Sequence, residues 1–335
     1  MSILKTKSSI RLGSWNGPKD DLLTTSAEMV TGLARVDLPL YVVDYGDGFV
    51  FSHSGVINIG GDHPVEGLPL LALTPACPPR RFGSASFSKD HRVRFCYVAG
   101  AMANGVASTE LVEAMGRARM LSFFGAAGLE PGTVEDAIDR ISTRLGNLPW
   151  GFNLIHSPYD SRLEETVANL YIRRGVKRVS ASAYMDLTLP LVRYRLHGIH
   201  LDASGRIVTP NRLIAKVSRV EVARKFFSPP PSKLLAVLVE EGDLSEEQAR
   251  MAESVPVAQD LTVEADSGGH TDNRPAITLL PTMLALRDRY QADYGYADPL
   301  RVGAAGGIST PRSVAAAFAM GADYVMTGSV NQACR

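Results

Sequence analysis

The chain has 335 residues, enough for one large α/β domain with a smaller domain beside it. Its 35 basic and 35 acidic residues balance, so no net charge draws it to nucleic acid or to an anionic membrane. Without a signal peptide, an apolar run of the roughly 20 residues that span a bilayer, or cysteines at metal-ligand spacing, the chain is expected to be cytoplasmic.

Residues 1–90 are expected to form a small N-terminal β-rich domain. Residues 41–51 contain two short apolar runs around Asp47-Gly48. An Asp-Gly pair between such runs is a strong short-range signal of a β-hairpin. Pro75, Pro78 and Pro79 then indicate an irregular connector to the rest of the chain.

Residues 91–335 alternate short apolar runs with amphipathic segments, the pattern of βαβ units on a parallel sheet. The amphipathic segments include residues 108–119, 133–145, 163–174 and 311–320. The strand candidates are residues 95–99, 120–124, 150–154, 178–182, 213–217, 261–265, 301–303 and 324–327. This number of strands favours an α/β fold of the closed (β/α)₈ TIM barrel type over a doubly wound sheet.

Two features depart from a plain barrel. Residues 220–259, between strands five and six, are too many for one helix, because residues 229–231 are three prolines. Ser245 and Gln248 form a capping box for a further short helix, and we expect a helical insertion over the barrel mouth. The sequence also stops directly after strand eight, so the eighth barrel helix is expected to be missing from this chain.

The chemistry of such a barrel lies at the C-terminal ends of its strands, so the residues there are the site candidates. Strand one ends in small residues that let a planar ring approach the backbone, followed by a methionine: Ala99, Gly100, Ala101 and Met102. Strand three ends in Asn153 and His156. Asn153 is a cofactor contact or a turn cap, and His156 is a pocket wall or a plain loop residue.

Strand five carries Lys216 among apolar neighbours, where a charge usually has a partner; the alternative is an ordinary surface lysine. Strand six leads into Glu264, Asp266, Ser267, Gly268, Gly269 and His270. The two glycines let the backbone approach a flat or phosphorylated ligand, and they present His270 on a turn. An imidazole there, with two carboxylates before it, is a candidate proton donor beside a bound cofactor.

Glycine-rich turns follow strands seven and eight. They contain Ala305, Gly306 and Gly307 in the first turn, and Gly328 and Ser329 in the second. Backbone N–H groups of such turns form the phosphate site of this fold, although two glycines alone also suit a tight turn. A phosphorylated cofactor held there, with a ring reaching strands one, three and five, has the size of FMN.

Five stretches carry a resemblance to a known family: residues 98–105, 152–158, 263–275, 302–308 and 327–333. Over residues 97–334 the chain resembles the trans-acting, flavin-dependent enoyl reductases of polyunsaturated fatty acid and polyketide synthases. These proteins belong to the nitronate monooxygenase (2-nitropropane dioxygenase) superfamily of FMN barrels.

The resemblance implies bound FMN, NADPH as reductant, and reduction of the 2,3-double bond of an enoyl thioester on an acyl carrier protein. It also implies that His270 is the acid or base, and that Gly306, Gly307, Gly328 and Ser329 hold the FMN phosphate. In this interpretation His270 protonates the α-carbon, and Lys216 stabilises negative charge on the reduced flavin.

Several alternatives stay open. His156 and Tyr184 are the other candidate proton donors. A nitronate monooxygenase-type FMN oxygenase, with His270 as a base, and a non-catalytic flavin-binding subunit of a synthase are the competing functions. The exposed insertion would also allow a homodimer.

Overall fold

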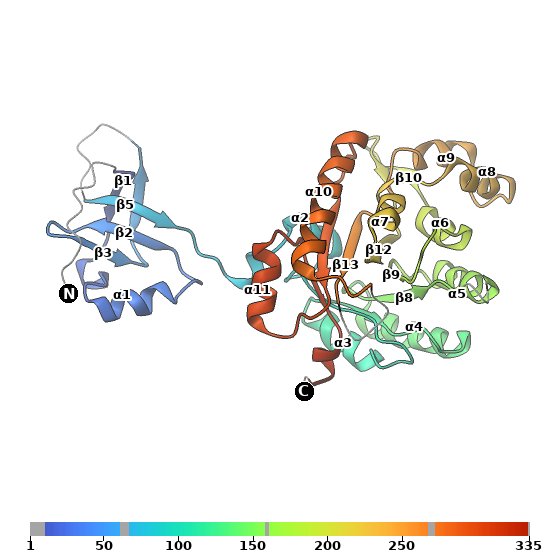
Figure 1. The fold of residues 1–335 in the computed structure, drawn as a ribbon, viewed down its shortest axis with the longest axis horizontal. Coiled ribbons are helices and arrows are strands. Elements are labelled where there is room, and N and C mark those ends of the chain that lie inside the picture. Colours follow the sequence, from blue (N-terminus) through green and yellow to red (C-terminus); the bar gives the residue numbers. More distant parts are fainter. Residues whose placement is uncertain (1–10, 61–66, 158–160, 267–271, 334–335) are drawn as a thin grey trace. The chain divides into compact units, whose positions relative to one another are not determined.

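The computed structural model describes residues 11–60, 67–157, 161–266 and 272–333. The chain divides into two compact units, Met1–Phe82 and Gly83–Arg335 (Figure 1). Each unit is described by itself. Among the described residues, no helix combines the length and the apolar character that crossing a bilayer requires.

The first unit is an antiparallel sheet in the order β3-β2-β5-β1-β4. Its strands are β1 (Gly13–Asn16), β2 (Leu40–Asp44), β3 (Phe49–Ser52), β4 (Val56–Ile59) and β5 (Leu68–Thr74). Strands β2 and β3 form the hairpin that Asp47-Gly48 predicts. Trp15, Val43 and Leu70 are fully or almost fully buried and form its core, with α1 (Ser26–Leu33) as the helix of this unit.

The second unit is a closed parallel barrel, which confirms the predicted fold class. Its strands, in chain order, are β6 (Tyr97–Ala99), β7 (Leu121–Phe124), β8 (Gly151–Ile155), β9 (Arg178–Ser182), β12 (Arg212–Val217), β13 (Asp260–Glu264), β14 (Arg301–Ala305) and β15 (Val325–Thr327). Each of them overlaps one predicted strand. Buried apolar runs of this kind are typical of strands that are covered on both faces.

Helices follow the strands and pack around the outside of the barrel (Figure 1). They are α3 (Thr109–Arg117), α4 (Pro131–Leu145), α5 (Ser161–Arg173), α6 (Leu189–Leu196), α7 (Val220–Phe227), α10 (Ala276–Tyr294) and α11 (Pro311–Ala319). Past β15 the described residues form a 3₁₀ helix, η3 (Ser329–Ala333).

The helical insertion is present, but its expected place over the barrel mouth is wrong. After α7, helices α8 (Ser232–Glu240) and α9 (Glu246–Ala252) pack on the outside of α6, and the capping box at Ser245 forms as predicted. The Gln248 side-chain amide donates to the Ile199 carbonyl, at 3.1 Å, just beyond the end of α6. Because α6 follows the C-terminal end of β9, its own end lies toward the N-terminal ends of the strands. The apolar faces of α8 and α9 therefore cover α6 rather than the mouth.

The floor of the barrel is closed by helix α2 (Ala85–His91), which belongs to the second unit although the sequence assigned it to the first domain. Phe87 is fully buried among interior residues such as Ile214. His91 is also fully buried, and its Nε2 lies 2.8 Å from a carboxylate oxygen of Asp260.

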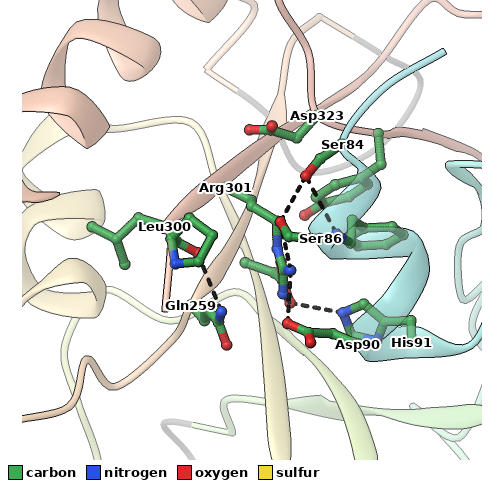
Figure 2. Close-up of polar contacts among 12 residues, drawn as sticks. Ser84, Ser86, Asp90, His91, Gln259, Leu300, Arg301 and Asp323 are labelled. Atoms are coloured by element: carbon green, nitrogen blue, oxygen red, sulfur yellow. Dashed lines mark hydrogen bonds and ion pairs between the residues drawn. The ribbon is translucent and has the colours of Figure 1, made fainter. Parts of the chain in front are cut away.

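Arg301 links strands β13 and β14 to helix α2. Its guanidinium contacts Asp260 at 2.5 Å and Asp90 at 2.8 Å, and it donates to the Ser86 hydroxyl at 3.2 Å. Figure 2 shows Ser86, Asp90 and His91 of α2 gathered around Arg301. The network ties the start of the second unit to strands β13 and β14.

Candidate active site

The C-terminal ends of the parallel strands share one rim, opposite the floor that α2 closes. Side chains alternate in direction along a strand, so Lys216 points to the same side as Ile214, which belongs to the cluster inside the barrel. Lys216 therefore faces the barrel axis near the rim.

Lys216 is paired with Glu264 of the neighbouring strand. The Lys216 Nζ lies 2.7 Å from Glu264 Oε1, and the two side chains are 19% and 21% exposed. A half-buried lysine with a carboxylate partner is not an ordinary surface lysine. The structure thus brings together two residues that the sequence proposed for the site, and it places a cation and an anion at the mouth of the barrel.

Asn153 supports the loop that follows β7. Its buried Oδ1 accepts hydrogen bonds from the backbone N–H groups of Ala126, at 2.7 Å, and Ala127, at 3.4 Å. The carbonyl of Ala127 in turn accepts from the N–H of Asn104, at 2.8 Å, in the loop after β6. Asn153 is therefore a turn support at the rim, as one of its two predicted roles requires. Its contact with a cofactor stays a prediction.

The residues after β6 line the same part of the rim. The Gly100 N–H donates to the Thr327 carbonyl at 2.8 Å, which joins the ends of the first and last strands. The carbonyl of Met102 lies so close to Gly125 that a Cβ at Gly125 would stand 1.7 Å from it. Ala99, which is fully buried, and Ala101, which is partly buried, present only small side chains to this part of the rim.

The glycine turns after β14 and β15 are adjacent, because these two strands are neighbours in the barrel. Gly306 has a φ of +90°, and a Cβ there would lie 2.4 Å from the Ala265 carbonyl, so only glycine fits. At Gly328 a Cβ would meet no atom nearer than the Met102 side chain, at 4.0 Å. Space therefore lies in front of Gly328, beside Ser329 at the start of η3, and Ala305 is buried at the end of β14.

Ser267, Gly268, Gly269 and His270 lie outside the described residues, but both ends of their loop are described. The Asp266 N–H donates to the Arg274 carbonyl at 2.9 Å, which closes the base of the loop. Asp266 itself is exposed.

Asp272 anchors the same loop to the residues after β12. Both carboxylate oxygens pair with the Arg219 guanidinium, at 2.8 and 2.9 Å, and the Ser218 hydroxyl donates at 2.7 Å. The hydrogen bonds from Arg219 and then Ser218 lower the pKa of Asp272 to about 2. Sequence reasoning missed this anchor, although Ser218-Arg219 directly after strand five and Asp272 close after His270 were its local signals.

Another carboxylate that the sequence did not single out, Glu164 of α5, gathers both alternative proton donors. Its oxygens accept from the Tyr184 hydroxyl at 3.0 Å and from the Thr188 hydroxyl, and His156 Nδ1 lies 3.0 Å away. Burial, and then the nearby carboxylate, raise the pKa of Tyr184. Tyr184 is 3% exposed, so its hydroxyl is committed to Glu164.

The chain is similar to synthase proteins and to a solved enoyl reductase domain. It is 42% identical over 311 residues to a subunit of the polyunsaturated fatty acid synthase of Thraustochytrium sp. (strain ATCC 26185 / S-3), a match that covers 92% of this chain and 20% of the relative. It is 45% identical over 251 residues to the polyketide biosynthesis protein PksE of Bacillus subtilis (strain 168), covering 75% of this chain and 33% of that protein.

The crystal structure of the enoyl reductase domain of MlnA, from the macrolactin biosynthesis cluster of Bacillus amyloliquefaciens, matches 76% of this chain and 58% of its own, with a TM-score of 0.73 and 42% identity. No protein-family model matches the chain. The chain spans about a fifth to a third of the length of the two curated relatives. As the resemblance predicted, the chain is homologous over most of its length to the MlnA enoyl reductase domain and to these fatty acid and polyketide synthase proteins.

Proposed function

We propose that this chain is a trans-acting enoyl reductase. It would reduce the 2,3-double bond of an enoyl thioester on an acyl carrier protein, with FMN as cofactor and NADPH as reductant. The observation that carries the proposal is the 42% identity to an enoyl reductase domain over 76% of this chain. A barrel rim with small residues, glycine turns and a paired lysine supports it.

The rim suits FMN in three respects. The space in front of Gly328 would take the phosphate, and the backbone of the glycine turns would donate hydrogen bonds to it. The small residues after β6 would allow the flavin ring to lie on the backbone. Lys216 would provide positive charge near the ring. When bound, FMN supplies the hydride transfer from NADPH to the β-carbon of the thioester.

The residues of this chain would supply the proton and the electrostatics. His270 would donate a proton to the α-carbon while hydride reaches the β-carbon, so the double bond becomes a single bond. Lys216 would stabilise the negative charge of the reduced flavin. The Asp272–Arg219 pair would hold the His270 loop against the residues after β12.

Product analysis under anaerobic conditions tests this proposal. The chain, loaded with FMN, is incubated with NADPH and crotonyl-acyl carrier protein, and mass spectrometry should detect the butyryl thioester. NADPH oxidation that requires O₂ and a nitronate, without butyryl product, would instead identify an oxygenase. FMN binding without turnover of either substrate would identify a non-catalytic subunit.

A further inference from the structure

A small pocket lies between the loop after β7, the end of β8 and the start of α5. Its volume is about 30 Å³, enough for two or three water-sized spheres. Asn153 lies in its lining at the rim, and Leu163 and Val167 of α5 lie in its lining on the helix layer. The pocket therefore extends outward from the rim, between two loops, and we name it the radial slot.

The walls of the radial slot are largely apolar. The lining residues are Ala126, Ala127, Gly128, Leu129, Asn153, Leu154, Ile155, Ser157, Leu163, Glu164 and Val167. The loop after β7 uses its polar groups within the protein: two of its N–H groups donate to Asn153, and the Leu129 N–H donates to the Ala126 carbonyl at 3.1 Å. This wall therefore presents chiefly carbon atoms to the slot.

Glu164 is the one ionisable residue of the lining, and its carboxylate contacts residues that are not part of the slot. Its carboxylate oxygens accept from Tyr184 and Thr188 and contact His156, which come from the β8–β9 side. The side chain is 3% exposed. A charged or strongly polar ligand would therefore find few partners in the slot, whereas a hydrocarbon segment would lose nothing by entering it.

We propose that the radial slot binds the acyl chain of the thioester substrate, directly beyond the reacting double bond. This inference rests on the proposed function. The slot begins at Asn153, which places its inner end at the rim where the reacting carbons would lie. Its small volume holds only the first carbons of a chain, so Val167 and Leu163 at the outer end set how easily a longer chain fits.

Substitutions at Val167 test the slot. Val167→Phe fills the outer end and Val167→Ala opens it, while Thr166→Ala, exposed on the same helix, is the matched control. The kcat/KM is measured for crotonyl, hexenoyl and decenoyl thioesters, and affinity is measured separately for saturated butyryl and decanoyl thioesters, which need no turnover. Val167→Phe should lower kcat/KM and affinity for the longest chain by roughly 10–200-fold relative to the shortest, the range expected when a hydrophobic pocket loses space. Val167→Ala should favour the longest chain.

The two proposals fail in different ways. An unchanged dependence of affinity on chain length in both Val167 variants would overturn the slot, whether or not thioesters are reduced. A changed dependence of affinity in a protein that reduces no thioester would support the slot as an acyl site and overturn the reductase. Reduction of FMN by NADPH should be the same in every variant, because the acyl chain of the thioester does not take part in that step.

Discussion

At the scale of single residues, the half-buried Lys216–Glu264 pair shows how a charge is accommodated inside a barrel strand. The lysine lies on an apolar strand, and its partner comes from the neighbouring strand at 2.7 Å. Such a pair holds a fixed cation near the rim at a defined place. The proton donor that we propose, His270, belongs by contrast to the loop between Asp266 and Asp272.

Replacing His270 with alanine tests that assignment. If His270 protonates the α-carbon, the rate of thioester reduction should fall by roughly 10²–10⁴-fold, the usual effect of losing a general acid. FMN binding and reduction by NADPH should stay near the wild-type values, because hydride delivery to the flavin needs no proton from His270. His200→Ala is the control. His200 lies on the short β10–β11 hairpin (His200–Leu201 with Ile207–Val208), and its Nδ1 is hydrogen-bonded to the Gly198 carbonyl. Wild-type thioester reduction in His270→Ala, with loss in His156→Ala, would move the donor to the end of β8.

At the scale of elements, the turns after β14 and β15 should determine whether FMN is retained. Gly328→Val is the sharper variant, because a Cβ at Gly328 meets no atom nearer than the Met102 side chain, at 4.0 Å, whereas Gly306 and Gly307 have positive φ angles. The added side chain should occupy the phosphate space, so the flavin-to-protein ratio after gel filtration should fall well below that of the wild type. Gly132→Val, at an open position of α4, is the control. Full flavin occupancy in Gly328→Val would show that the phosphate lies elsewhere.

The loop that carries His270 depends on its anchor. Asp272→Asn removes the charge that pairs with Arg219, so the loop should be held less firmly and thioester reduction should slow by about 10–100-fold, as misplaced catalytic groups do. The pKa of Asp272 is lowered to about 2, so the anchor is complete above the ordinary carboxyl pKa and is lost only as the pH falls through about 2. The pH profile of the wild type at neutral pH should therefore not report this group. Asp202→Asn is the control, because Asp202 is exposed and lies between β10 and β11. An equal effect of both variants would contradict the anchor.

At the scale of the whole molecule, the buried network at the barrel floor should control stability. Breaking a buried pair typically costs about 3–5 kcal/mol, so Asp260→Asn should lower the unfolding free energy of the second unit by that order. Trp15 and Trp150 lie in different units, so fluorescence in a Trp15→Phe background reports on the barrel alone. An Asp260→Asn variant with the urea midpoint of its background would refute a stabilising role for the network.

The same network predicts a pH dependence. Burial lowers the pKa of His91 from its ordinary 6.5. Burial alone would raise the pKa of Asp260, but Arg301 and His91 outweigh it and lower that pKa. Both groups take up protons more readily when unfolded, so stability is complete above about pH 6.5 and decreases as the pH falls below it. The urea midpoint should be lower at about pH 5 than at about pH 7.5, and less so in His91→Gln; equal midpoints in the wild type would contradict this account.

The sequence predicted the barrel strands well because each is a buried run bounded by turn signals. Strand β9 begins and ends where the sequence places it. Strand β14 extends past the expected end at residue 303, because its last two residues are alanines, which carry little strand signal in a sequence. The position of α8 and α9 could not be predicted, since an amphipathic face does not say what it covers. The floor network was equally hidden, because His91 and Asp260 are 169 residues apart in the chain.

The candidate site was predictable where neighbouring strands place side chains at one rim, as for Lys216 and Glu264. It was not predictable where a loop residue finds a distant partner, as Asp272 finds Arg219, or where a helix residue such as Glu164 collects side chains from β8, β9 and α6. The local sequence indicates where the strands end, whereas these contacts depend on which loops meet in three dimensions.

The most direct test of the central claim is a two-step anaerobic mixing experiment on the FMN-loaded chain. NADPH should first bleach the flavin absorbance, and crotonyl-acyl carrier protein should then restore it in the absence of O₂, with formation of one butyryl thioester for each flavin reoxidised. Flavin that stays bleached with the thioester and recovers only on admission of O₂ would contradict the assignment of this chain as an enoyl reductase.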